Sequence, residues 1–124
     1  MRILVAEDER VLANTIATAL RAALEVEVDV AFDGSSAQEF VQRNDYQLVV
    51  IDFCLPPPTG LELVGRWREA ENPPPVLMMS GGDGQARKLD ALAAGATDCL
   101  EKPFPLAELI HKARSSMKIK EGIG

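Results

Sequence analysis

The sequence predicts an α/β domain built on one parallel sheet of five strands, with five helices wound on its two faces. Five short apolar or alternating segments are separated by segments in which apolar residues recur every three or four positions. The first pattern is typical of strands and the second of helices with one buried face. Strands that alternate with helices along a chain form a doubly wound parallel sheet, because each crossover needs a helix's length of chain.

The five predicted strands differ in how fully they are buried. We expect them near residues 2–6, 26–32, 47–52, 75–80 and 97–100. The run LVVI at 48–51 is continuously apolar, which is typical of a strand buried on both faces. The second strand alternates apolar and acidic residues, so we expect it at an edge of the sheet with one face in water.

The segments between the strands carry helical patterns with their own start and stop signals. Ser35 or Ser36 is the expected N-cap of a short second helix, and Gly60 precedes the third. Gly95 should close the fourth helix, and Pro105 should lie in the first turn of the fifth. The apolar faces that we expect to be buried are Leu12, Ile16, Ala19, Leu20 and Ala23; Ala37, Phe40 and Val41; Leu63, Val64 and Trp67; Leu89, Leu92 and Ala93; and Leu106, Leu109, Ile110, Ala113 and Met117.

The length and composition indicate one globular domain. The chain has 124 residues, 47% hydrophobic and 26% charged, which are ordinary values for a soluble protein. No apolar stretch approaches the ~18 residues that a membrane helix needs. The first strand begins so close to the N-terminus that no room is left for a signal peptide, so we expect the cytoplasm. The domain should cover residues 1–117, and residues 118–124 should form a frayed tail.

The charge and the cysteines argue against a nucleic-acid-binding domain and against a disulfide-bonded one. A net charge of −6 argues against direct binding of nucleic acid by this domain. Cys54 and Cys99 follow the third strand and fall in the fifth, so they should lie two strand spacings, roughly 9–10 Å, apart. A disulfide needs Cα atoms within about 7 Å. We therefore expect two free thiols.

Charged and polar side chains end four of the predicted strands. In chain order they are Glu7, Asp8 and Glu9, then Asp52, then Ser80, then Lys102. Taken alone, Asp52 would be one more aspartate at a strand end, where this residue is common. Because the carboxyl ends of parallel strands form the ligand-binding edge of a sheet, we expect all four groups to meet. Carboxylates can hold a divalent metal and attack phosphorus, and a hydroxyl and an ammonium can bind phosphoryl oxygens.

In this order and at these spacings, the chain resembles the receiver domain of two-component response regulators. The resemblance runs from about residue 1 to about residue 117. The segments that carry it are Glu7-Asp8-Glu9, Asp52-x-x-Leu55-Pro56-x-x-x-Gly60, Ser80-Gly81, Gly95-Ala96-Thr97-Asp98 and Lys102-Pro103-Phe104. The resemblance implies the flavodoxin-like strand order 2-1-3-4-5, which periodicity alone does not supply.

The resemblance also implies a phosphorylation-controlled signalling switch and not an enzyme with a substrate of its own. Asp52 would accept a phosphoryl group from a phosphohistidine on a sensor histidine kinase or a histidine phosphotransfer protein. Mg²⁺ would be bound by Asp8, by Asp52 and by the backbone carbonyl of Cys54, with Glu7 holding one of its waters. Without the metal, we expect the clustered acids to raise the pKa of at least one of them.

Two further residues take implied roles at the phosphoryl group. Lys102 would pair with Asp52 and then with a phosphoryl oxygen, its direction fixed by a cis bond to Pro103. Ser80 would donate a hydrogen bond to the phosphoryl group and draw the following glycine-rich loop with it. With the loop held loosely in the free form, residues 80–84 would become ordered on phosphorylation.

The chain departs from the family pattern at four positions. Cys99 stands three residues before Lys102, where an aromatic ring is usual, so coupling by ring rotation is lost; the thiol is either a small apolar filler or redox-sensitive. Cys54 and Gly82 flank the expected path of hydrolytic water and leave the phosphoryl lifetime open. Asp90 stands where regulators that dimerise through their fourth helix carry a basic residue, so that dimer is not expected.

Three alternatives are less consistent with the residues. A pseudo-receiver that acts as an adaptor without phosphorylation would not need Asp8, Asp52, Ser80 and Lys102 together. A phosphohydrolase with an aspartyl nucleophile commonly has an Asp-x-Asp pair, whereas Phe53 and Cys54 follow Asp52 here. A nucleotide- or flavin-binding domain would need a glycine- or hydroxyl-rich loop after the first strand, where this chain is acidic.

Overall fold

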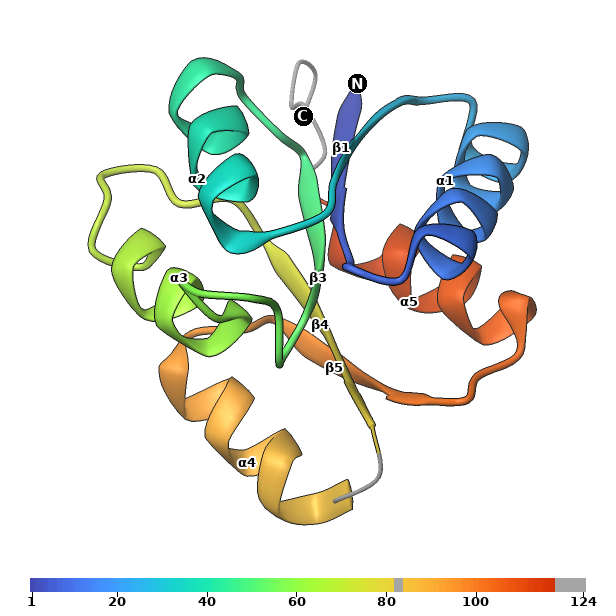
Figure 1. Ribbon diagram of the computed structural model, residues 1–124. Coiled ribbons are helices and arrows are strands. Elements are labelled where there is room, and N and C mark those ends of the chain that lie inside the picture. Colours follow the sequence, from blue (N-terminus) through green and yellow to red (C-terminus); the bar gives the residue numbers. More distant parts are fainter. Residues whose placement is uncertain (82–83, 118–124) are drawn as a thin grey trace.

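The computed structural model describes residues 1–81 and 84–117, with the backbone alone for 84–86. Strands and helices alternate along the chain (Figure 1). Their bounds are β1 Arg2–Ala6, α1 Arg10–Leu24, β2 Glu27–Ala31, α2 Gly34–Arg43, β3 Leu48–Asp52, α3 Gly60–Trp67, β4 Val76–Gly81, α4 Gly84–Ala94, β5 Asp98–Lys102 and α5 Leu106–Ser116. The predicted tail, 118–124, lies outside the described residues.

All strands pair in parallel in the order β2-β1-β3-β4-β5, which confirms the predicted fold. Successive strand residues point to opposite faces, so each strand supplies two cores. In β3, Val49 and Ile51 pack with α2 and α3, while Leu48 and Val50 pack with α1 and α5. Figure 1 shows α1 and α5 on one side of the sheet and α2, α3 and α4 on the other. Among the described residues, no helix is long and apolar enough to span a bilayer.

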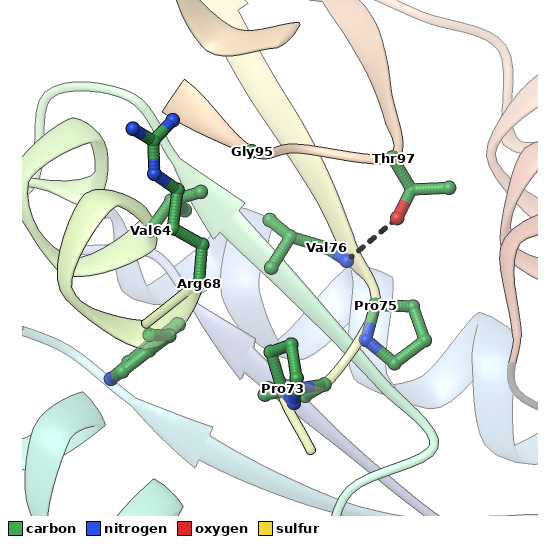
Figure 2. A pocket seen from close by; sticks show the side chains of 9 residues that line it. Val64, Arg68, Pro73, Pro75, Val76, Gly95 and Thr97 are labelled. Atoms are coloured by element: carbon green, nitrogen blue, oxygen red, sulfur yellow. Dashed lines mark hydrogen bonds between the residues drawn. The ribbon is translucent and has the colours of Figure 1, made fainter. Parts of the chain in front are cut away.

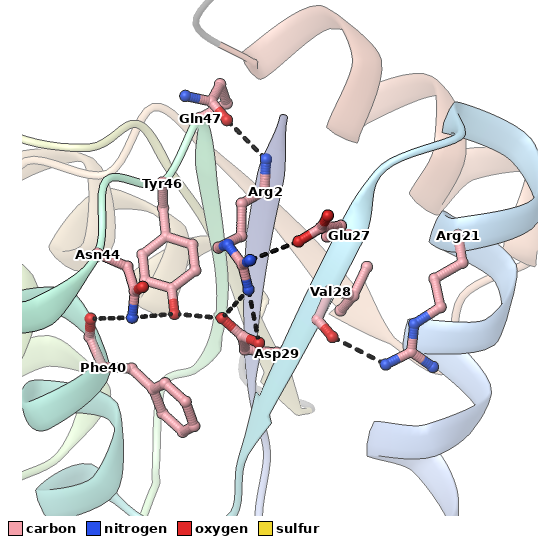
Figure 3. A network of polar contacts seen from close by, with 9 residues as sticks. All are labelled: Arg2, Arg21, Glu27, Val28, Asp29, Phe40, Asn44, Tyr46 and Gln47. Atoms are coloured by element: carbon pink, nitrogen blue, oxygen red, sulfur yellow. Dashed lines mark hydrogen bonds and ion pairs between the residues drawn. The ribbon is translucent and has the colours of Figure 1, made fainter.

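A polar network holds the edge strand β2 at the amino end of the sheet (Figure 3). The Arg2 guanidinium donates to both carboxylate oxygens of Asp29 at 3.0 Å and also pairs with Glu27. The buried Tyr46 hydroxyl donates to Asp29 at 2.7 Å. Burial of the ring and this hydrogen bond raise the pKa of Tyr46. β2 is therefore an edge strand, as its acidic alternation predicted, and its inner acid is paired.

Two helix caps differ from the prediction. The N-cap of α2 is Asp33, whose side chain accepts a hydrogen bond from the backbone N–H of Ser36 at 2.7 Å. The expected cap, Ser35 or Ser36, was wrong because Asp33 already satisfies the free N–H of the first turn. Pro105 is the N-cap residue of α5 and not part of its first turn. Gly95 closes α4 as predicted, with φ of +124°, a conformation that glycine adopts without strain.

The predicted buried face of α4 was wrong. Leu89 and Leu92 are 60% and 39% exposed, and Ala91 is buried instead. The helix turns its small residues to the sheet, since Ala91 and Ala94 pack against the core around Met78 and Cys99. Leu106 of α5 and Ala23 of α1 are also exposed. The other predicted faces, including Leu63, Val64 and Trp67 of α3, are buried or half-buried apart from Ala93.

Candidate functional site

The predicted site residues meet at the carboxyl edge of the sheet. Glu7 follows β1 directly, Asp52 ends β3 and Lys102 ends β5. Ser80 lies near the end of β4 and pairs with Glu101 across the β4–β5 ladder, one residue before the pairing of Gly81 with Lys102. This edge is where a parallel sheet binds ligands, because the strand ends and the following loops leave open space there.

Three carboxylates form the centre of the site. Glu7, Asp8 and Asp52 each offer one carboxylate oxygen, and these oxygens all lie within 4.8 Å of one another. Glu7 and Asp52 are 1% and 8% exposed, whereas Asp8 is open to solvent. A half-open set of hard oxygen donors fits Mg²⁺, which binds few carboxylates and keeps several waters. The Cys54 carbonyl ligand predicted from the resemblance stays a prediction, although Cys54 lies at the start of the adjoining loop.

Lys102 enters this cluster from β5. Its Nζ lies 2.7 Å from Glu7 Oε1 and 3.5 Å from Asp52 Oδ1, so its shorter contact is with Glu7 and not with the predicted partner. The peptide bond from Lys102 to Pro103 is cis. The ammonium thus balances part of the negative charge that the two buried acids bring into the site.

Burial and pairing shift the pKa of both partners upward. Burial raises the pKa of Glu7, and the nearby charge of Asp52 adds to the rise, against the opposing effect of Lys102. Burial alone would lower the pKa of Lys102, but the hydrogen bond to Glu7 and the charge of Asp52 more than offset it and raise it. The free site is therefore short of positive charge, which is what a divalent cation supplies.

The loop after Asp52 is held close to the site. The backbone N–H of Phe53 donates to Met79 O at 2.8 Å. A Cβ at Gly60 would come within 2.1 Å of the Asp52 carbonyl oxygen, so only glycine fits where α3 begins. Thr59 and Glu62 form a capping box there. The family's Asp-to-Gly spacing thus has a steric cause in this chain.

Ser80 is buried, 5% exposed, at the end of β4. The loop predicted to follow it to the phosphoryl group includes Gly82, which lies outside the described residues. The same holds for the predicted ordering of residues 80–84 on phosphorylation, of which only the first two and the backbone of the last are described.

The two cysteines are free, as expected. Cys99 is 8% exposed, and its Sγ lies 3.9 Å from the carbonyl oxygen of Lys88 on α4. Burial raises the pKa of the Cys99 thiol, with Asp98 adding to the effect. A small, protonated, buried thiol fits the reading as an apolar filler, and it lies against α4 where an aromatic ring is usual.

The sequence did not predict that two arginines contact the loops that follow β2 and β3. The Arg10 guanidinium carbon lies 4.0 Å from the centroid of the Phe32 ring, and that of Arg87 lies 4.7 Å from the centroid of Phe53. Arg87 also donates to the Sγ of Cys54 at 3.0 Å. Each contact joins a helix residue to a loop distant from it in the sequence, so no local spacing could have indicated it.

A pocket of about 310 Å³ lies at the opposite, amino end of the sheet, between α3 and the start of β4 (Figure 2). Trp67, Pro73 and Val76 contribute to its walls. The Val76 N–H donates to the Thr97 hydroxyl oxygen there, at 3.3 Å. It is separated from the carboxylates by the length of the strands and takes no part in their chemistry.

Comparison with known proteins agrees with this geometry. A family model described as the response regulator receiver domain matches residues 3–114. The chain belongs to the response regulator receiver domain family. Among solved structures, it is similar to the receiver domain of the Francisella response regulator 1452, with 32% identity, a TM-score of 0.86, and coverage of 92% of this chain and 93% of that one. It is also similar to the receiver domain of NtrX from Brucella abortus, with 31% identity, a TM-score of 0.84, and coverage of 92% and 96%.

Curated relatives of this receiver domain are longer. The transcriptional regulatory protein CutR of Streptomyces coelicolor is 40% identical over 93% of this chain and 52% of its own length. The transcriptional regulatory protein DltR of Streptococcus agalactiae is 38% identical over 92% of this chain and 50% of its own length. The receiver chain therefore spans about half the length of these relatives, which are named as transcriptional regulatory proteins.

Proposed function

We propose that this receiver domain is a phosphorylation-controlled switch in which Asp52 accepts a phosphoryl group. The observation that supports this best is the meeting of three carboxylate oxygens within 4.8 Å, with the Lys102 ammonium at 2.7 Å from one of these acids. An aspartate held at the end of a buried strand, beside a cation site and a lysine, is equipped for attack on phosphorus.

The chemistry assigned to Asp52 is transfer from a phosphohistidine. A carboxylate oxygen of Asp52 forms the new bond to phosphorus while the bond between phosphorus and the donor imidazole nitrogen breaks. The electron pair of that bond stays with the imidazole, and an acyl phosphate remains on Asp52. Attack by an anion on an anion is opposed electrostatically, and a bound Mg²⁺ would offset that repulsion.

The residues suited to hold Mg²⁺ are Asp8 and Asp52, together with the backbone carbonyl of Cys54. Glu7, buried and already hydrogen-bonded to the backbone N–H of Glu9 at 3.0 Å, is suited to orient a metal-bound water. Lys102 is placed to leave Glu7 and to bind a phosphoryl oxygen, and Ser80 is suited to donate its hydroxyl hydrogen to another. Lys102 and Ser80 orient the phosphoryl group and do not themselves react, whereas Asp52 is the nucleophile.

The partners follow from this chemistry. The donor would be a sensor histidine kinase or a histidine phosphotransfer protein in the cytoplasm. The curated relatives are named as transcriptional regulators, and each is about twice as long as the matched region. With a net charge of −6, the receiver domain itself is not suited to contact nucleic acid, so any such output would belong to another segment or partner.

Incubation with Mg²⁺ and acetyl phosphate, followed by intact-mass measurement, tests the assignment. The wild type should gain one phosphoryl group, roughly 80 Da, and Asp52→Asn should gain none. Asp90→Asn, on the exposed surface of α4, is the matched control and should be labelled like the wild type. A wild type that stays unlabelled would favour the adaptor alternative, and labelling of Asp52→Asn would assign the site to another residue.

A further inference from the structure

Arg87 joins helix α4 to the two residues that follow Asp52. Its guanidinium carbon lies 4.7 Å from the centroid of the Phe53 ring, and its Nη1 donates to the Sγ of Cys54 at 3.0 Å. Both contacts come from one half-buried side chain in the first turns of α4. The loop that leaves β3 is thus held from the helix that follows β4.

The geometry uses features that are particular to arginine. A planar guanidinium can rest over an aromatic ring and still donate an N–H to a neighbouring acceptor. A lysine ammonium is a point charge and does not present this fork. The paired contact therefore fixes Phe53 and Cys54 relative to each other as well as relative to α4.

The residues that Arg87 contacts, Phe53 and Cys54, directly follow Asp52, so their position affects the geometry of the site. The backbone N–H of Phe53 is bound to Met79 O, so β4 holds one side of the loop. Asp52 precedes Phe53, and the carbonyl assigned to the metal belongs to Cys54. A shift of this dipeptide would move the Cys54 carbonyl relative to the Asp52 carboxylate.

The polar contact that joins Cys99 of β5 to α4 is weak. Cys99 reaches α4 through a contact of 3.9 Å from its Sγ to the Lys88 carbonyl oxygen, and a thiol is a weak donor. With a cysteine there, no ring at that position can transmit a movement of Ser80. The Arg87 side chain, in contrast, contacts Phe53 and Cys54, the two residues that directly follow Asp52.

We propose that Arg87 is a positioning residue that sets the Cys54 carbonyl for the metal and couples the placement of α4 to the occupancy of the site. The inference rests on the proposed function, since it assigns Arg87 a part in the same metal and phosphoryl site. Coupling is reciprocal: if α4 favours the ion-binding form of the loop, the bound ion must favour that placement of α4.

The test compares Arg87→Ala with Lys88→Ala, which removes an exposed charge from the next position on the same helix. Mg²⁺ affinity is measured by calorimetric titration, and hydrogen exchange is measured with and without Mg²⁺ and beryllofluoride. Arg87→Ala should weaken Mg²⁺ binding about three- to fivefold. In the metal-free protein it should speed exchange at Phe53 and Cys54. Lys88→Ala should change neither.

The decisive measurement is the change in hydrogen exchange along residues 87–94 when Mg²⁺ and beryllofluoride are added. The wild type and Lys88→Ala should gain protection there, and Arg87→Ala should gain much less. If Arg87 merely stabilised α4, its loss would lower protection equally in both forms and leave Mg²⁺ affinity unchanged. That pattern would overturn the inference.

Phe53→Leu supplies a second, independent variant. It removes the ring that the Arg87 guanidinium contacts but keeps an apolar side chain for the core. If Arg87 acts through this contact, the loss of Mg²⁺ affinity in the double variant Phe53→Leu/Arg87→Ala should be no greater than in Arg87→Ala alone. Fully additive losses would show that the two residues act separately and would overturn the inference. A wild type that binds neither Mg²⁺ nor beryllofluoride would overturn the proposed function and this inference together, whereas normal binding by both wild type and Arg87→Ala would overturn the inference alone.

Discussion

The Nζ of Lys102 lies 2.7 Å from Glu7 Oε1, closer than its 3.5 Å distance to Asp52 Oδ1. The lysine that ends β5 is thus bound first to the buried acid after β1, on the far side of the strand that carries Asp52. In the free domain this pair compensates a carboxylate that is 1% exposed. Asp52, the proposed phosphoacceptor, has the longer of the two contacts with the ammonium, and under that proposal Lys102 would leave Glu7 to bind the phosphoryl group.

Lys102→Ala should therefore destabilise the domain in a pH-dependent way. The pKa of Glu7 is raised above its ordinary value of 4.5, so the folded state holds this proton to a higher pH than the unfolded state. The contribution of the protonated Glu7 carboxyl to stability is lost as the pH rises above 4.5. Without Lys102 the pKa of Glu7 rises further, and the loss steepens. We expect a cost of about 1–2 kcal/mol at neutral pH, and less in acid.

Urea unfolding across this pH range measures the effect, with Lys88→Ala as the surface control. The control should stay within about 0.5 kcal/mol of the wild type at every pH. A cost for Lys102→Ala that is the same at acid and neutral pH would show that the Glu7 charge is not what Lys102 compensates.

Mg²⁺ should stabilise the folded domain through Asp8. A ligand that binds only the folded state adds about 1 kcal/mol when its free concentration is about fivefold above Kd. Since Asp8 is the open carboxylate of the cluster, Asp8→Ala should abolish the Mg²⁺-dependent rise in Tm. Thermal melts with Mg²⁺ and with EDTA give the comparison, and Asp90→Ala is the charge-matched control. A rise in Tm that persists in Asp8→Ala would remove Asp8 from the metal site.

The sequence predicted the strands and the groups at their ends because both depend on local patterns, and the strand order came from the resemblance to the receiver family. Apolar runs that end at Asp52 and Ser80, and a short segment that ends at Lys102, mark strands and the groups at their ends, and parallel pairing then brings those groups together. It failed where packing between elements decides. Which face of α4 is buried depends on how closely Ala91 can approach the sheet. The Arg87 contacts depend on where α4 lies relative to a loop more than 30 positions away in the sequence.

The receiver domain should not form a dimer through the surface made by α4, β5 and α5. Lys112 donates to Cys99 O at 2.7 Å and lies 3.8 Å from both Asp98 and Glu108, so these charges are engaged within one chain. Asp90 on α4 supplies no basic partner for a second copy. Sedimentation with Mg²⁺ and beryllofluoride should give a monomer. A tight dimer that is lost in Leu89→Ser, at an exposed apolar side chain of α4, would contradict this expectation.

The two thiols should differ sharply in reactivity. Cys54 is exposed, whereas Cys99 is buried and its pKa is raised, so at a given pH less of Cys99 is the reactive thiolate. The native protein should therefore take up one iodoacetamide group, at Cys54, at about pH 8, and the second only in denaturant. Because the unfolded thiol ionises at lower pH than the folded one, Cys99 should also cost stability as the pH rises through about 8.5, and Cys99→Ala should lose that part of the alkaline decline. Peptide mapping after labelling assigns the sites, with Cys54→Ser as the control that should remain unlabelled when native. Rapid native labelling of Cys99 would show that the space between β5 and α4 opens readily, and a thiol there would then be a reactive group and not a filler.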